Sequence, residues 1–109
     1  MRDYVPGTVF VAEVPFDDRG GTKRRPVVLI GNPGYWGRDD SALVCPLTTA
    51  IHRRTDVPLD WQPLGLPRPS RARPRPRLLP KMDLQWRLGQ LSAQDLAALK
   101  TALRKTLDL

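Results

Sequence analysis

The chain has 109 residues, a formal net charge of +7 and 40% hydrophobic residues. This length predicts one domain, residues 1–109, with a single hydrophobic core. No apolar run approaches the ~20 residues that a membrane-spanning helix needs, and residues 1–6 lack the apolar segment of a signal peptide. We therefore expect a cytoplasmic protein with no membrane partner, and the excess of positive charge favours nucleic acid as a partner.

Cysteine and histidine are too scarce for a metal centre. The chain has one of each, which excludes a zinc site built from several such ligands. It contains no phosphate-binding loop ending in Gly-Lys-Ser/Thr and no His-Glu-x-x-His motif, so nucleotide hydrolysis and metalloprotease chemistry have no support. Cys45 lies in an apolar run and is predicted to be a core residue. We expect no metal and no cofactor.

Three short strands are predicted in the first half of the chain. Val and Phe are frequent in residues 5–14, and aliphatic residues fill the segments 26–30 and 42–47. Polar residues 17–23 predict a turn between the first two strands, and the breaker-rich residues 31–40 predict a loop before the third. Such short spacings favour antiparallel pairing.

Proline dominates residues 56–80. We expect the prolines there to exclude any helix and any long central strand: Pro58, Pro63, Pro67, Pro69, Pro74, Pro76 and Pro80. The segment is therefore predicted to form brief strands near residues 57–59 and 70–73. A loop that holds Trp61 is expected between them.

The C-terminal residues predict a helix. Ser92 and Asp95 fit the N-cap and N3 positions of a capping box, and Leu91 and Leu96 fit a hydrophobic staple. Leucines then recur at helical spacing and form one apolar stripe: Leu96, Leu99, Leu103 and Leu107. We expect this stripe to pack on the barrel, and a partner interface is the alternative.

A flexible cationic turn is predicted to present Arg25 at the start of the second strand. Residues 20–24 supply two glycines and two cations, and Pro26 is tolerated as the first residue of a strand. The aliphatic residues 27–30 then anchor the strand, so Arg25 should be held more rigidly than the two cations before it. This arrangement suits an anion site, and a solvated basic hairpin loop is the alternative.

Arginine is concentrated between Asp60 and Asp83, where no acidic residue occurs. Alternate residues of an extended chain share a face, so four of these arginines are expected to line one edge of a groove: Arg71, Arg73, Arg75 and Arg77. Their planar guanidinium groups suit phosphate oxygens. The alternative is a solvated edge whose charges prevent aggregation.

Hydroxyl and imidazole groups follow the third strand. Thr48 and Thr49 have an ordinary explanation, since threonine often stabilises turns. A catalytic role for Thr48 depends on its lying beside Arg25, which we expect if the two strands end at one edge. His52 has a pKa range suited to acid–base catalysis, and a solvated loop histidine is the alternative.

Aromatic side chains offer stacking surfaces for unpaired bases. Trp36 and Trp61 fall in predicted loops, where stacking is feasible. We expect Trp86 to serve in structural packing instead.

Three segments in this order resemble the MazF/PemK family of toxin endoribonucleases: residues 6–11 (Pro-Gly-Thr-Val-Phe-Val), 23–30 (Lys-Arg-Arg-Pro-Val-Val-Leu-Ile) and 44–49 (Val-Cys-Pro-Leu-Thr-Thr). The likeness extends to residues 88–92 (Leu-Gly-Gln-Leu-Ser) and the closing helix. It implies a mainly β fold, a small SH3-like antiparallel barrel with a C-terminal α-helix. It also implies a homodimer and neutralisation by a cognate antitoxin protein.

The resemblance further implies a metal-independent endoribonuclease of a type II toxin–antitoxin module, which cleaves single-stranded RNA through attack by a 2′-hydroxyl. The arginine and threonine that the family ties to cleavage match Arg25 and Thr48. Other side chains are expected to bind the RNA: Lys23, Arg24, Thr49, His52, Arg71, Arg73 and Arg75. The alternative is a barrel of the same fold that binds nucleic acid without catalysis or poisons a topoisomerase.

Two departures from the family pattern concern the general base. Residues 18–22 (Asp-Arg-Gly-Gly-Thr) replace a Gly-x-Glu-Gln segment, and residues 73–75 (Arg-Pro-Arg) stand where some members carry Asp before a basic residue. A base supplied by that Asp is missing. Either Arg73 or Arg75 positions phosphates, or His52 supplies the base, or the chain cleaves slowly or not at all.

Overall fold

The computed structural model describes residues 5–16, 20–31, 41–50 and 54–109. Its longer strands are β1 (Thr8–Pro15), β2 (Thr22–Leu29), β3 (Ser41–Thr48) and β7 (Leu84–Gln90), and its shorter ones are β4 (Val57–Pro58), β5 (Arg71–Ala72) and β6 (Arg77–Pro80). One-turn 3₁₀ helices, η1 (Gln62–Leu64) and η2 (Lys81–Asp83), precede the α-helix α2 (Ala93–Leu107). Within these ranges no helix has the length and apolar character needed to cross a membrane.

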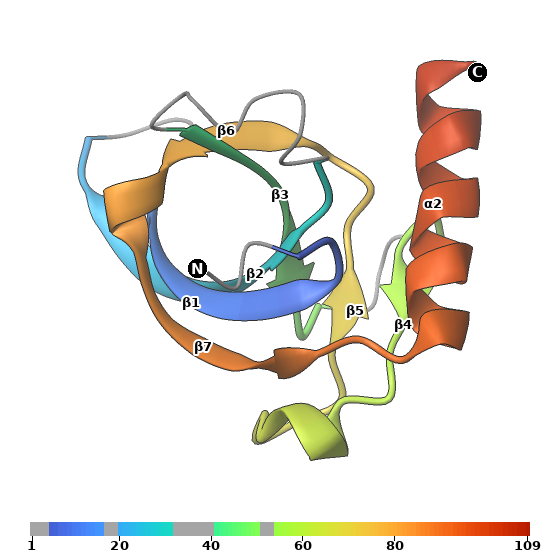
Figure 1. Ribbon diagram of the computed structural model, residues 1–109, viewed down its shortest axis with the longest axis horizontal. Coiled ribbons are helices and arrows are strands. Elements are labelled where there is room, and N and C mark those ends of the chain that lie inside the picture. Colours follow the sequence, from blue (N-terminus) through green and yellow to red (C-terminus); the bar gives the residue numbers. More distant parts are fainter. Residues whose placement is uncertain (1–4, 17–19, 32–40, 51–53) are drawn as a thin grey trace.

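The strands form one antiparallel sheet that curls into a small barrel. Its order is β4-β5-β3-β2-β1-β7, and β6 pairs with β3 beside β5. Figure 1 shows β1, β2, β3, β6 and β7 arranged around a common interior, with η2 connecting β6 to β7. Strand pairing does not close the ring in the described part of the chain. The predicted mainly β, SH3-like fold with a C-terminal helix is confirmed.

Two hydrophobic clusters explain why the central strands are apolar on both faces. One cluster fills the barrel interior and includes Phe10, Val27, Leu29 and Val44, among others. The other lies on the opposite face, where the sheet meets α2: Val9, Val28, Cys45, Leu47, Val57, Leu59, Leu64, Ala72, Leu91 and Leu99. Successive side chains of a strand point to opposite faces, so β2 supplies Val27 to one cluster and Val28 to the other. The predicted core position of Cys45 is confirmed.

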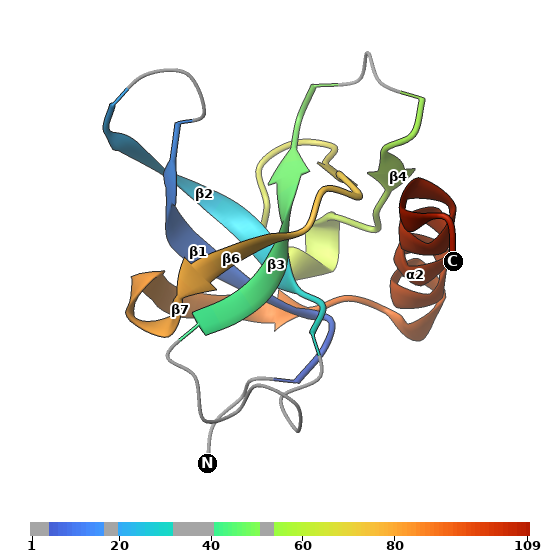
Figure 2. The same cartoon turned by 90° about the horizontal axis from the view of Figure 1, so that it is seen from above.

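Helix α2 begins at the predicted cap and lies beside β4 (Figures 1 and 2). The hydroxyl of Ser92 accepts a hydrogen bond from the Asp95 N–H at 3.1 Å, which satisfies one free donor of the first turn. The Asp95 carboxylate does not complete the capping box; it accepts from the Asp60 N–H at 2.8 Å and ties the helix to the segment before η1.

The predicted leucine stripe packs on the sheet only in part. Leu99 is fully buried, and Leu96 and Leu103 pack against the same cluster. Leu107, the last residue of the helix, is 51% exposed.

Two predictions about the elements were wrong. β2 begins at Thr22, earlier than residue 26, because its first residues pair with β1 as one arm of a hairpin. η1 contradicts the exclusion of any helix between residues 56 and 80, since Pro63 fits the first turn of a helix.

Strands β6 and β7 were not predicted. β6 is short and ends in Pro80. β7 has mostly exposed or half-buried side chains and pairs with β1 through two register shifts, so its sequence carries no regular alternation.

Candidate active site

The candidate site lies where β2 and β3 separate. β2 pairs with β3 only through residues 27–29, whereas residues 22–26 pair with β1 alone. Leu47 and Thr48, at the end of β3, pair instead with β5. The prediction that Pro26 is the first residue of its strand was therefore wrong. Pro26 lies in the part of β2 that has a neighbouring strand on one side only, where a missing N–H is tolerated.

A cleft of about 200 Å³ occupies this fork, and we call it the Thr48 cleft. Its lining residues are Lys23, Arg24, Arg25, Pro26, Leu47, Thr48, Thr49 and Ser70. Alternation places Arg25 on the same face of β2 as Val27, and Thr48 on the same face of β3 as Val44. Both side chains thus lie on the interior face of the barrel, at its open end. The structure brings Arg25 and Thr48 to one cleft; their chemical roles stay predictions.

Thr48 is held in a turn that leaves its hydroxyl proton available. Its Oγ1 accepts a hydrogen bond from the Ala50 N–H at 3.1 Å. A hydroxyl has two acceptor positions and one O–H donor, so the donor remains for a ligand in the cleft. Arg71 lies directly across from Thr48 in the β3–β5 pair, which places their Cβ atoms roughly 4.5–5.5 Å apart.

A second cleft, of about 230 Å³, adjoins the first and shares Arg25 with it. We call it the arginine cleft, and its lining residues are Val14, Arg25, Pro46, Arg73, Arg75, Pro76 and Arg77. Three of the four arginines predicted to share a face line it. Arg71 does not line it, whereas Pro76 does, because the chain is not a regular strand between β5 and β6.

Arg73 has a structural partner that the sequence did not reveal. Its Nε donates to Oδ2 of Asp56 at 3.3 Å, and the two side chains are 16% and 1% exposed. The backbone N–H of Arg73 also donates to the Pro46 carbonyl at 3.0 Å. Because one partner is almost fully buried, removing the other would leave an uncompensated charge in the interior. Arg73 therefore joins the start of β4 to the wall of the arginine cleft.

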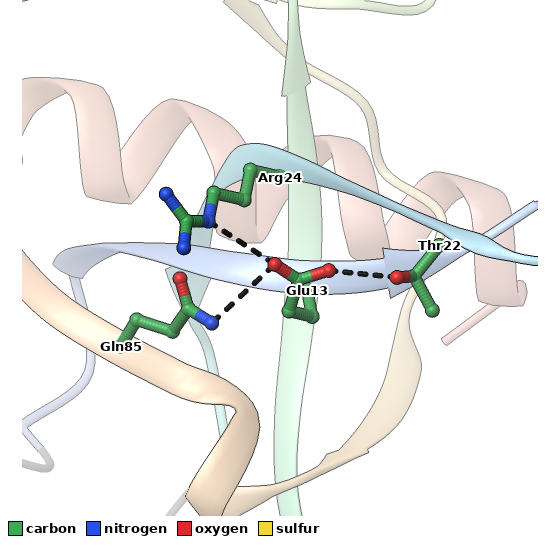
Figure 3. Close-up of polar contacts among 4 residues, drawn as sticks. All are labelled: Glu13, Thr22, Arg24 and Gln85. Atoms are coloured by element: carbon green, nitrogen blue, oxygen red, sulfur yellow. Dashed lines mark hydrogen bonds and ion pairs between the residues drawn. The ribbon is translucent and has the colours of Figure 1, made fainter.

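Alternation along β2 places Arg24 on the face opposite to Arg25, where it contacts Glu13 (Figure 3). Its Nε donates to Glu13 at 3.2 Å, and Glu13 also accepts from Thr22 Oγ1 at 2.7 Å and from Gln85 Nε2 at 3.4 Å. The hydrogen bond from Thr22 is the main reason that the pKa of Glu13 is lowered. Lys23, Arg24 and Thr49 all line the Thr48 cleft, but the Arg24 guanidinium is already paired.

The aromatic predictions had mixed outcomes. Trp86 is 46% exposed, and the Arg24 guanidinium packs over its ring, 5.5 Å from the ring centre, so its structural contact is with a surface side chain and not with the core. Trp61 is half-buried at the start of η1. Trp36 and His52 lie outside the described residues.

Sequence reasoning missed Glu13, and it did not connect Asp56 with the site. The β1–β2 register, which puts Glu13 opposite Arg24, is the signal for the first pair. No sequence pattern indicates the second. The linings of both clefts contain, among the described residues, neither a carboxylate nor an imidazole.

Comparisons with known proteins agree with this architecture. Residues 6–107 match the family model of the PemK-like, MazF-like toxins of type II toxin–antitoxin systems. Among curated protein sequences, none matches this chain.

Solved structures are similar over almost the whole chain. The Mycobacterium tuberculosis toxin MazF-mt6 is 28% identical, with a TM-score of 0.74, and the match covers 94% of this chain and 97% of that one. MazF of Deinococcus radiodurans, in a MazE-MazF structure, is 25% identical, with a TM-score of 0.71 and coverage of 98% and 99%. A mycobacterial endoribonuclease in complex with its cognate antitoxin is 19% identical, with a TM-score of 0.79 and coverage of 96% and 95%, which shows the fold alone. Since the family model spans nearly all of its residues, the chain belongs to the PemK-like, MazF-like toxins of type II toxin–antitoxin systems.

Proposed function

We propose that the chain is an endoribonuclease toxin that cleaves single-stranded RNA without a metal ion. The observation that supports this most directly is the presence of Arg25 and Thr48 in one cleft at the fork between β2 and β3. Family membership supports the same function class. The +7 net charge would draw a polyanion to the cleft.

In the proposed reaction, an RNA 2′-hydroxyl attacks the adjacent phosphorus. The new bond joins O2′ to phosphorus as the 2′-hydroxyl loses its proton to a general base. The bond to O5′ breaks as O5′ takes up a proton, and the products are a 2′,3′-cyclic phosphate and a 5′-hydroxyl. Negative charge on the phosphoryl oxygens rises in the transition state, so a preorganised guanidinium and hydroxyl bind that state more tightly than the substrate. Arg25 would stabilise this charge, and the O–H of Thr48 would donate to a phosphoryl oxygen.

The described linings of the two clefts supply no general base, because their side chains are cationic, hydroxyl or apolar. His52 is the candidate base from the sequence, since it follows Thr48 closely. If it serves, kcat for His52→Ala should lose the inflection that an imidazole gives between about pH 5 and 8. An unchanged pH profile would remove His52 from the mechanism.

The test of the proposed function is cleavage of a long RNA in the presence of a chelator. We expect the wild-type chain to cut RNA, Arg25→Ala and Thr48→Ala each to slow cutting by about 10²-fold or more, and Thr48→Ser to retain most activity. Arg104→Ala is the matched control for charge, because Arg104 is exposed on α2 and lines neither cleft. A DNA copy should survive, because it has no 2′-hydroxyl.

Binding of RNA without cutting would contradict the proposal and favour a non-catalytic barrel. The proposal also includes a homodimer and a cognate antitoxin. The solved MazE-MazF structures of Deinococcus radiodurans support an antitoxin partner by analogy with the family. Size-exclusion chromatography with light scattering tests the dimer.

A further inference from the structure

The arginine cleft has no part in the reaction as described, yet it adjoins the Thr48 cleft through Arg25. Four guanidinium groups line it, and they come from three places in the fold: β2, the connection after β5, and β6. Cations gathered around one small volume repel one another, which costs electrostatic free energy. An anion bound between them would remove that cost.

The charge of this cleft is only partly neutralised by the protein itself. Arg73 is paired with Asp56 through its Nε, which leaves the other donors of its guanidinium for a ligand. Arg25 and Arg75 form no ion pair with any carboxylate in the described part of the chain. The cleft therefore retains positive charge that a bound anion would balance.

The size and walls of the cleft indicate what kind of anion fits. Its volume of about 230 Å³ is below the range of about 300–1,000 Å³ typical of pockets that enclose whole organic ligands, so a phosphate group suits it better than a nucleoside. Pro46 and Pro76 form stiff walls. The Arg75 N–H also donates to the Arg73 carbonyl at 2.7 Å, so the backbone that carries both arginines is fixed before a ligand arrives.

We propose that the arginine cleft is a second phosphate subsite, which binds the backbone phosphate next to the scissile one on the same RNA strand. Arg25, at the boundary, contacts both phosphates. This proposal rests on the proposed RNA-cleaving function, which identifies the ligand as RNA. It gives Arg75 and Arg77 roles in substrate binding. The subsite positions the strand so that the scissile phosphate lies beside Thr48.

A double-mutant-type cycle tests this subsite: one change is made in the protein and the other in the RNA substrate. Cleavage sites are first mapped on a long RNA, and an oligonucleotide spanning one site is then made with a neutral methylphosphonate at one link at a time. For the wild type, we expect a neutral link beside the scissile one to raise KM by about tenfold or more with little change in kcat. For Arg75→Ala, the same link should have almost no further effect, because the lost contact is already absent.

The control variant is Arg104→Ala, which changes an arginine that lines neither cleft. Arg104→Ala should keep the full tenfold penalty of the neutral link. If the penalties of Arg75→Ala and the neutral link simply multiply at every position, or if no link beside the scissile one matters, the subsite is overturned. Competition by inorganic phosphate that Arg75→Ala abolishes, without any methylphosphonate effect, would assign the cleft to free phosphate and also overturn it.

Failure of the proposed function can be told apart from failure of the subsite. If the wild type cuts no RNA, the same cycle is measured as the Kd of a 2′-O-methyl oligonucleotide, which cannot be cleaved. A neutral link whose penalty disappears in Arg75→Ala then supports a phosphate subsite in a binding protein. A uniform response at all links overturns the subsite independently of catalysis.

Discussion

Arg25 owes its position to side-chain alternation along β2. Its neighbours Val27 and Leu29 are fully buried in the barrel interior, so the same face carries the Arg25 side chain to the open end. Arg24 faces the other way and pairs with Glu13. Adjacent residues of the same charge thus have different surroundings, and only one of them faces both clefts.

Glu13 weakens the attraction of Arg24 for an anionic ligand. Its pKa is lowered, mainly by the Thr22 hydrogen bond, so it stays ionised in mild acid and its stabilising effect is lost only as the pH falls through that lowered pKa. We predict that Glu13→Gln tightens RNA binding about two- to fivefold at low salt, as expected for the loss of one surface ion pair. Fluorescence anisotropy measures this, and Asp108→Asn, at the far end of α2, should change little. Weaker binding would mean that Glu13 contributes to the site.

Cys45 provides a probe of the folded core. Burial raises the pKa of its thiol to about 12, from 9.0 when exposed, so folded protein keeps the thiol protonated where unfolded protein loses the proton. We predict that stability is unaffected by this group below pH 9 and falls as the pH rises from 9 towards 12. Iodoacetamide should label native protein negligibly at pH 8 and label it fully in denaturant. Rapid labelling of the native chain would contradict the buried position.

At the scale of elements, α2 closes one hydrophobic cluster while leaving the barrel interior to the strands. Leu99 is fully buried against β4 and its neighbours, whereas Leu107, two turns later, is half-exposed. The helix is also tied to the sheet by the Asp95 contact with Asp60. Its contribution to stability should therefore decrease along its length.

A matched pair of leucines tests this gradient. We predict that Leu99→Ala lowers the free energy of unfolding by about 2–5 kcal/mol, because it removes buried methyl groups and leaves a cavity. Leu107→Ala should cost less than about 1 kcal/mol, since half of that side chain already contacts solvent. Urea denaturation measures the loss of unfolding free energy for each variant, provided that the m-value is unchanged. Equal losses would mean that the end of α2 packs against something in solution, such as a second copy of the chain.

At the scale of the whole molecule, positive charge is concentrated where the sheet opens. Arg25, Arg71, Arg73, Arg75 and Arg77 all lie at or beside the two clefts, although they come from separate parts of the chain. Such clustering strengthens long-range attraction of a polyanion more than the same charges spread evenly. It also makes RNA binding depend on salt.

Salt dependence separates cleft arginines from distant ones. We predict that Arg71→Ala and Arg75→Ala each flatten the slope of log affinity against log salt by about 0.7, the effect of one lost phosphate contact on a single strand. Arg104→Ala should leave the slope unchanged. Arg73→Ala is unsuitable, because it would leave Asp56 buried without its partner and destabilise the fold. Equal slopes for Arg71→Ala, Arg75→Ala and Arg104→Ala would mean that RNA binds elsewhere on the surface.

The sequence by itself determined the parts of this protein that depend on local patterns. Apolar runs predicted the three long strands around Phe10, Val28 and Val44, and the Ser92 cap predicted where α2 begins, because burial and capping leave a signal in neighbouring residues. Tertiary structure alone decided the fork between β2 and β3, the pairing of Arg73 with Asp56, and the division of the arginines between two clefts. These depend on register between strands that are distant in sequence, and a one-residue shift would turn every side chain to the other face.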